Sequence, residues 1–257
     1  MKAKAGLLIA ALVGTTLGHA PAVSAAEIKV LTAGAFKQVL MALVPEYEKQ
    51  TGNKVVVDND TAGGLAKRIE GGDAFDVVVI TPNVLADLTR KGKVTEGSAT
   101  TLASVGVGVV VKEGAPKPDI STVDAFKQAL LKAKSVAYID PKSGGSSGIY
   151  VEKLLERLGI ADQIQPKTKL KQGGAVAELV ASGEAELGVH QISEILPVKG
   201  VTLVGPLPKE IQNLTTYAAG LSSAPKQPEA AKAFIKALSG PQAAAVLKSK
   251  GMQPAGS

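Results

Sequence analysis

The amino-acid sequence predicts an α/β protein built from two lobes. From Glu27 onward, short runs rich in β-branched residues alternate with helical patterns, which is typical of helices packed on mostly parallel strands. The alternation stops at the proline-rich segment EGAPKPDI and restarts after it, and no central strand or helix would tolerate that segment. A single continuous domain needs no such restart. We therefore expect two similar α/β sets in tandem, with helices flanking mostly parallel sheets.

In the first set, strands lead directly into helices. Val39, Leu40, Leu43 and Val44 are spaced to form one buried helix face, and Gly52 then ends that helix. A continuous apolar strand, VGVGVVVK, closes the set. The expected strands are 27–32, 53–59, 75–81 and 105–112, and the expected helices are 35–51, 63–71 and a third that begins at Pro82.

The second set repeats this order, and two short helices follow it near the end of the chain. The expected helices are 122–133, 148–158, 174–182, 227–238 and 241–249, and the expected strands are 135–140, 168–172 and 185–190.

Residues 1–26 have the pattern of a cleavable export signal. Lys2 and Lys4 give a basic start, Gly6 to Leu17 is apolar, and small residues end at Ala26. The apolar run is too short for a membrane-spanning helix, and no later run approaches that length. The mature chain is therefore expected outside the cytoplasm and not embedded in a membrane.

Composition excludes several classes of function. Removing the signal and its two lysines from 257 residues, with 29 basic and 23 acidic, leaves 231 residues and a net charge of +4. The basic residues are dispersed and aromatics make up only 3%, so a nucleic-acid partner is not expected, whereas a small anion is compatible. The chain has no cysteine, and His190 is alone after the signal, so neither a metal nor another cofactor is expected. A monomer is the default.

Small and hydroxyl-bearing residues gather where strands turn into helices. Free N–H groups and the positive end of the helix dipole make such turns anion sites, and glycine allows close approach. Any one of these turns is explained by helix capping, but their repetition favours an anion site made from several helix starts. The residues are Thr32, Gly34 and Ala35; Thr61, Ala62, Gly63 and Gly64; Thr81, which precedes Pro82; the segment SGGSSG with Ser146 and Ser147; and KQGGAVAE with Gly173.

Known catalytic motifs are missing. The chain has no GxxxxGK[ST] loop, no GxGxxG after the first strand, and no GxSxG with partners in a suitable order. His190 ends a predicted strand, on the side of an α/β sheet where ligands bind. It is either packed in the interior or, if it faces a cleft, able to hydrogen-bond a carboxylate or transfer a proton.

From Glu27 to Met252 the chain resembles the molybdate-binding type of periplasmic solute-binding proteins. The motifs that carry the resemblance are GGLAKRIEGG followed by AFDVVV and a turn of the ITP type, DP before SSGIY, ELVASGEAELGV, and LSGPQAAAVLKSKGM. The resemblance implies a type II periplasmic binding fold, the Venus flytrap, that closes on a ligand at its hinge. It implies lobe 1 at 27–105 and 210–257, lobe 2 at 106–209, a periplasmic location, and an ABC permease or membrane sensor as partner.

This sequence departs from the family at its oxyanion-binding positions. Ala35 and Ala62 stand where molybdate binders usually have serines, and Gln191 where they have a tyrosine. Each lost hydrogen bond to a charged group costs roughly 1.5–3 kcal/mol, so an organic polycarboxylate fits better than molybdate. Lys37 and Lys142 are expected on the surface. The predicted ligand-binding residues are Gly34, Ala35, Thr61, Ala62, Gly63, Thr81, Ser146, Ser147, Gly173, His190 and Gln191.

A branch of the same family is assigned as periplasmic aconitate isomerase, which changes the class of function from binding to catalysis. Moving a proton along an allylic carboxylate system needs a base and donors that hold the delocalised charge. His190, Tyr150 or Asp140 could be that base. Because most proteins on this scaffold only bind, binding of a small anion is the first interpretation, isomerisation of aconitate the alternative, and binding of molybdate or tungstate the third.

Overall fold

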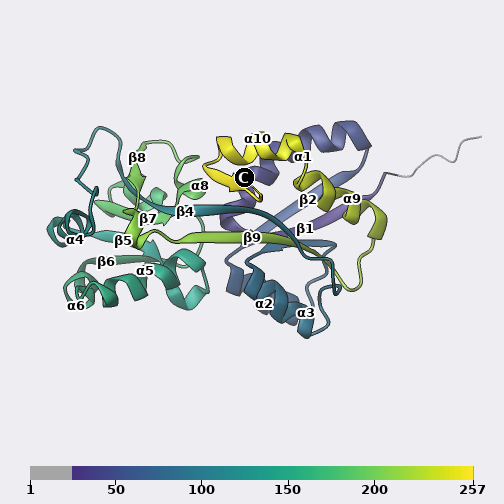
Figure 1. Cartoon of the computed structure of the whole chain (residues 1–257), viewed down its shortest axis with the longest axis horizontal. Coiled ribbons are helices and arrows are strands. Elements are labelled where there is room, and N and C mark those ends of the chain that lie inside the picture. The colour runs from purple at the N-terminus through teal and green to yellow at the C-terminus, as the bar shows by residue number, and fades with distance from the viewer. Residues whose placement is uncertain (1–24, 257) are drawn as a thin grey trace, which may run out of the picture.

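The computed structural model describes residues 25–256 (Figure 1). The predicted export signal, apart from its last two residues, lies outside this range. The helices are α1 (Gly34–Thr51), α2 (Ala62–Glu70), α3 (Pro82–Arg90), α4 (Val123–Lys132), α5 (Ser146–Arg157), α6 (Ala161–Ile164), α7 (Ala177–Ser182), α8 (Ile192–Ile195), α9 (Pro228–Leu238) and α10 (Pro241–Ser249). The strands are β1 (Glu27–Ala33), β2 (Lys54–Asp60), β3 (Val77–Ile80), β4 (Thr100–Lys112), β5 (Val136–Ile139), β6 (Thr168–Lys171), β7 (Leu187–Gln191), β8 (Val201–Pro206), β9 (Leu214–Leu221) and β10 (Met252–Pro254).

Within these residues the strands form one mixed sheet in the order β2-β1-β3-β9-β4-β7-β5-β6, and β8 and β10 also pair with β4. Pairing is parallel in the outer groups, β2-β1-β3 and β7-β5-β6, where each strand is followed by a helix. It is antiparallel at β9 and β4, which run through the middle of the molecule and join its two ends (Figure 1). The α/β prediction is confirmed, and the antiparallel centre is the part that the alternation pattern did not show.

The hydrophobic core divides into two lobes. Lobe 1 is built around β1 and β3, with α1, α9 and α10 packed on one face and α2 and α3 on the other. Lobe 2 is built around β5 and β7, with α4 to α6 on one face and α7 and α8 on the other. Because both faces are covered, the central strands are apolar throughout, as in VVVI of β3 and VAYI of β5. The predicted boundaries at 105/106 and 209/210 stay a prediction.

Local sequence signals explain where most helices begin and end. Gly52 ends α1 with a φ of 72° and donates its N–H to the Glu48 carbonyl, as predicted. Pro82 occupies the first turn of α3. Gly174 has a φ of 74°, which is not helical, so α7 begins at Ala177 and not at the predicted residue 174. The four-residue helix α8 is too short to give a periodic signal.

Candidate functional site

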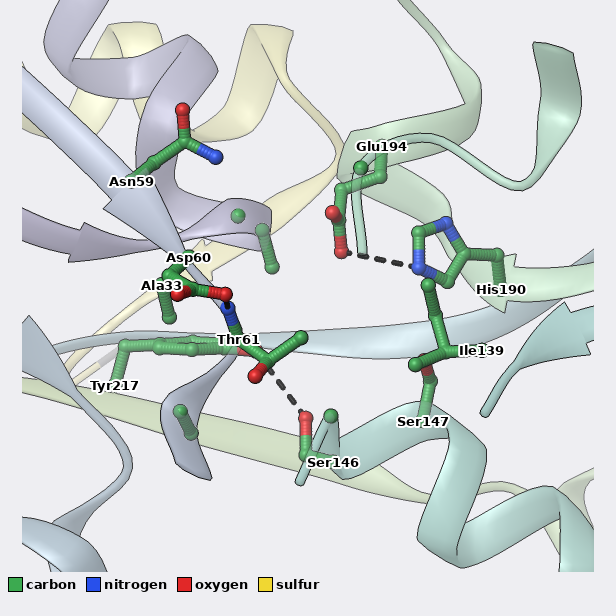
Figure 2. A pocket seen from close by; sticks show the side chains of 15 residues that line it. Ala33, Asn59, Asp60, Thr61, Ile139, Ser146, Ser147, His190, Glu194 and Tyr217 are labelled. Carbon is green, nitrogen blue, oxygen red and sulfur yellow. Dashed lines mark hydrogen bonds and ion pairs between the residues drawn. The ribbon is translucent and has the colours of Figure 1, made fainter. Parts of the chain in front are cut away.

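Three helix starts from the two lobes meet at one pocket. The pocket has about 390 Å³ of empty space, a figure that includes its opening to solvent. Figure 2 shows the labelled side chains arranged around this space. The residues that line it are Ala33, Gly34, Ala35, Asn59, Asp60, Thr61, Ala62, Ile139, Gly145, Ser146, Ser147, Gly174, His190, Glu194 and Tyr217.

Two of the three helix starts are open towards a ligand. The residues that precede α1 and α5, Ala33 and Gly145, have no side chain that could cap the first amides. At α2, by contrast, Thr61 accepts a hydrogen bond from Gly64 N at 3.0 Å. The free N–H groups at α1 and α5, together with the positive ends of both helix dipoles, can therefore hold a negative group in the pocket.

The lobes touch each other on both sides of the pocket. On one side, Gly63 N donates to the Gly144 carbonyl at 3.1 Å, and the Thr61 hydroxyl donates to the Ser143 carbonyl. A methyl group added to Gly63 would lie 2.8 Å from Gly144 Cα, so only glycine allows this approach. On the other side, Ser193 Oγ donates to the Ala35 carbonyl at 2.8 Å. These contacts join the two lobes on both sides of the pocket.

The structure brings together seven of the residues that sequence analysis singled out: Gly34, Ala35, Thr61, Ala62, Ser146, Ser147 and His190. Four others lie around them. Gly63 belongs to the interlobe contact, and a methyl group on Gly173 would come within 3.7 Å of Thr61 Cγ2. Thr81 lines a neighbouring pocket, and Gln191 is buried behind Ser146.

Two candidate bases are engaged elsewhere. Asp140 accepts hydrogen bonds from Lys142 N at 2.9 Å and Gln172 Nε2 at 2.6 Å, and Tyr150 donates to the Ile211 carbonyl. Neither lines the pocket, and neither do Lys37 and Lys142. Among the pocket residues that the structure describes there is no lysine or arginine, and Asp60 adds a carboxyl group, so the groups that can bind an anion are the helix starts and the hydroxyls.

The chemically distinctive feature is a buried pair of titratable side chains, His190 and Glu194. His190 Nε2 lies 3.4 Å from Glu194 Oε2, and the side chains are 1% and 13% exposed (Figure 2). Burial raises the pKa of Glu194 to about 8 and lowers the pKa of His190 to about 3, because both charged forms lose hydration. Both groups are therefore mostly neutral at pH 7. Glu194 can gain or lose a proton near neutral pH, as an acid–base catalyst must.

The position of Glu194 depends on a glycine in the other lobe. A methyl group on Gly34 would lie 2.5 Å from Glu194 Oε1, so the glutamate reaches the start of α1 only because residue 34 has no side chain. His190 Nδ1 is buried without a partner among the described residues. The pair therefore has hydrogen-bonding capacity left for a ligand.

Hydroxyl groups complete the pocket. Ser146 Oγ lies 3.4 Å from Tyr217 Oη, and it accepts from Gln191 Nε2 at 3.3 Å. Gln191 Nε2 also donates to Thr215 Oγ1 at 2.9 Å. Burial, with the charge of Glu194, raises the pKa of Tyr217 well above its ordinary value, so the phenol stays protonated. Ser146 and Tyr217 are thus neutral donors for an anion.

Sequence reasoning missed Glu194, Asp60 and Tyr217. Glu194 follows His190 by four residues in HQISE, but His190 lies on β7 and Glu194 on α8, so the turn between them and not a helical spacing brings the pair together. Tyr217 lies on β9, far along the chain, and reaches the pocket because β9 pairs with β3 and β4. No local sequence pattern predicts that Tyr217 reaches the pocket.

In the part of the chain that the structure describes, no cluster of three or more His, Cys, Asp or Glu residues is placed to hold a metal. Between residues 25 and 256 there is also no helix with the length and apolarity needed to cross a membrane.

A pocket that lies between two lobes, with helix starts from both in its walls, is typical of a two-lobed ligand-binding protein. A family model of bacterial extracellular solute-binding proteins matches residues 28–253, and the chain belongs to that family. It is 34% identical over 233 residues to an aconitate isomerase from a Pseudomonas species, a match that covers 88% of this chain and 87% of that one.

Other relatives bind oxyanions. The chain is 29% identical over 239 residues to the molybdate-binding protein ModA of Azotobacter vinelandii, covering 90% of this chain and 91% of that one. The solved structure of an Azotobacter vinelandii periplasmic molybdate-binding protein superposes with a TM-score of 0.73 at 22% identity, covering 88% of this chain and 98% of that one. This likeness confirms the type II periplasmic binding fold.

Proposed function

We propose that this protein binds a small unsaturated polycarboxylate of the aconitate type between its lobes and isomerises it by proton transfer. The observation that carries the proposal is the buried His190–Glu194 pair in the wall of the pocket. A carboxyl group whose pKa lies at about 8 can take and return a proton near neutral pH, as an isomerase requires. The similarity to an aconitate isomerase supports the same function.

The binding part of the proposal rests on neutral donors. Ligand carboxylates accept hydrogen bonds from the open amides at the starts of α1 and α5 and from the hydroxyls of Ser146 and Tyr217. Ala35 and Ala62 leave space at positions where serine hydroxyls would donate hydrogen bonds to a compact oxyanion. The pocket therefore favours a flatter and larger organic anion over molybdate.

The proton transfer needs no other reagent. The ionised Glu194 carboxylate takes a proton from the CH₂ carbon of the ligand, and that C–H electron pair forms a new double bond to the middle carbon. The old double bond opens, and its far carbon takes a proton back from Glu194. The charge that develops on the ligand carboxylate is held by the helix starts. His190 Nε2 contacts Glu194 and holds its carboxyl group in place.

Incubating the purified protein with trans-aconitate and following the cis isomer by NMR tests the proposal. We expect turnover, with kcat/KM rising as the pH increases towards about 8, because the base is the ionised form of Glu194. Binding of aconitate without turnover at any pH between 6 and 9 would contradict catalysis and leave a binding protein.

The second candidate function is solute binding for transport or sensing. Family membership and the interlobe contacts at Gly63 and Ser193 favour it. In that case the protein works in the periplasm after its export signal is removed, and presents its closed form to an ABC permease or a membrane sensor. A melting assay with molybdate, tungstate, citrate and aconitate separates the ligand classes. A shift with molybdate or tungstate alone would favour the oxyanion-transport function.

A further inference from the structure

A second pocket lies beside the first, also between the lobes. It is formed by the start of α3 with Asn83, by the start of α5, and by the segment that leads into β9 with Asn213. Ala62 and Ser146 line both pockets, so the two spaces share a wall. No charged residue of the described chain lines this second pocket, which mixes polar and apolar side chains and is more open than the first.

Thr81 gives the second pocket an unused hydrogen-bonding group. It precedes α3, a nine-residue helix, at the capping position, yet its side chain makes no capping hydrogen bond. Only 8% of its surface is exposed, and its hydroxyl has no hydrogen bond within residues 25–256. Thr61, at the same position of α2, both accepts from Gly64 N and donates to the Ser143 carbonyl. Thr81 lines the second pocket, so its unpaired hydroxyl can donate a hydrogen bond to a group bound there.

The chemistry around Thr81 suits a carboxylate. Pro82 contributes no N–H, but the amides of Asn83 and Val84 lie in the first turn of α3 and have no acceptor within the helix. They lie at the positive end of the helix dipole, next to the Thr81 hydroxyl. Around Thr81 this site offers one helix start and one hydroxyl, fewer donors than the main pocket, so we expect it to hold a carboxylate that is already tethered and not a free anion.

We propose that this second pocket is a subsite for one carboxylate arm of a polycarboxylate whose other carboxylates occupy the main pocket. This inference rests on the proposed function. The arm passes between Ala62 and Ser146, because these residues line both spaces. The small side chain of Ala62 leaves room for it. The subsite therefore selects tricarboxylates over dicarboxylates.

Two substitutions test the subsite, with titration calorimetry of trans-aconitate and fumarate as the measurement. Thr81→Val removes the hydroxyl and keeps the shape. Asn83→Asp places a negative charge in the first turn of α3, where it favours the helix but repels a bound carboxylate. We expect both variants to bind trans-aconitate about tenfold more weakly, the cost of about one charge-assisted hydrogen bond, and to bind fumarate as the unchanged protein does. Thr101→Val, an exposed substitution on β4, is the control.

The outcomes separate this inference from the function on which it rests. If the unchanged protein binds no tricarboxylate, the proposed function is wrong and the subsite falls with it. If it binds trans-aconitate and both variants bind equally well, only the subsite is wrong. If excess acetate adds to the melting shift of the fumarate complex, and Thr81→Val abolishes that addition, the site takes a separate anion, which overturns the tethered arm.

Discussion

The two walls of the main pocket differ in chemistry. The wall from lobe 1, residues 33–35 and 59–62, offers small side chains, two helix starts and hydrogen bonds from the main chain. The wall from lobe 2 brings the buried pair of His190 and Glu194 and the hydroxyls at the start of α5. The lobe 1 wall can hold many anions, because main-chain N–H groups and helix dipoles bind a negative group whatever molecule carries it. In the proposed function the lobe 2 wall also reacts with the bound molecule, because Glu194 exchanges a proton near neutral pH.

The largest expected effect comes from the reactive wall. Glu194→Gln keeps the size of the side chain but removes the proton that it exchanges, so we expect turnover of aconitate to fall by about 100-fold or more. Binding of trans-aconitate should change by less than about threefold, since the wall from lobe 1 is intact. Glu96→Gln, at an exposed position, is the matched control. Equal losses of binding and turnover would mean that Glu194 holds the ligand and does not react with it.

Protonation of Glu194 in the lobe 2 wall should make the free energy of unfolding depend on pH. Between pH 6.5 and 8 the folded protein keeps a proton on Glu194 that the unfolded chain, with an ordinary pKa of 4.5, has released. The free energy of unfolding should therefore fall with rising pH in this window, by at most about 1.4 kcal/mol per pH unit.

His190 acts in a separate pH window. Its folded pKa of about 3 lies below its ordinary value of 6.5, so its contribution to stability rises with pH between these values and is complete above them. Melting of the protein and of Glu194→Gln at pH 6.5, 7.3 and 8 isolates the glutamate. An equal slope in both would contradict a buried, protonated Glu194.

The smallest expected effect on ligand affinity comes from the contact between Gly63 and Gly144, which joins the two lobes. Gly63→Ala should push α2 away from Gly144 by a few tenths of an ångström and weaken trans-aconitate binding by about threefold to tenfold. Because alanine favours a helix over glycine, the variant without ligand should melt no lower than the unchanged protein. Calorimetry with small-angle scattering measures both quantities, and Gly71→Ala at the far end of α2 is the control. Unchanged affinity would show that the Gly63–Gly144 contact does not contribute to closure.

The lobe 1 wall was more predictable from sequence than the lobe 2 wall. Gly34, Ala35, Thr61 and Ala62 stand at strand-to-helix junctions, where a local pattern fixes both the backbone and its free amides. The α/β alternation likewise predicted most of the elements in order, but not α6, α8, β8, β9 and β10. The antiparallel crossing by β4 and β9 was not predictable from local patterns, because pairing between distant strands leaves no periodic trace.

The reactive wall depends on packing between distant segments. Glu194 lies on a helix of only four residues, and its pKa is set by burial against the other lobe. Thr81 is a second case in which a local pattern did not predict which pocket a residue lines. Its junction looks like the one at Thr61, yet α3 lies one strand further from the main pocket, so its hydroxyl faces the neighbouring space.

A crystal structure of the protein grown with trans-aconitate tests the account most directly. We predict the ligand between the lobes, with carboxylate oxygens accepting hydrogen bonds from amides at the starts of both α1 and α5 and with its CH₂ carbon against the Glu194 carboxyl. A ligand held by one lobe alone, or bound away from Glu194, would contradict it.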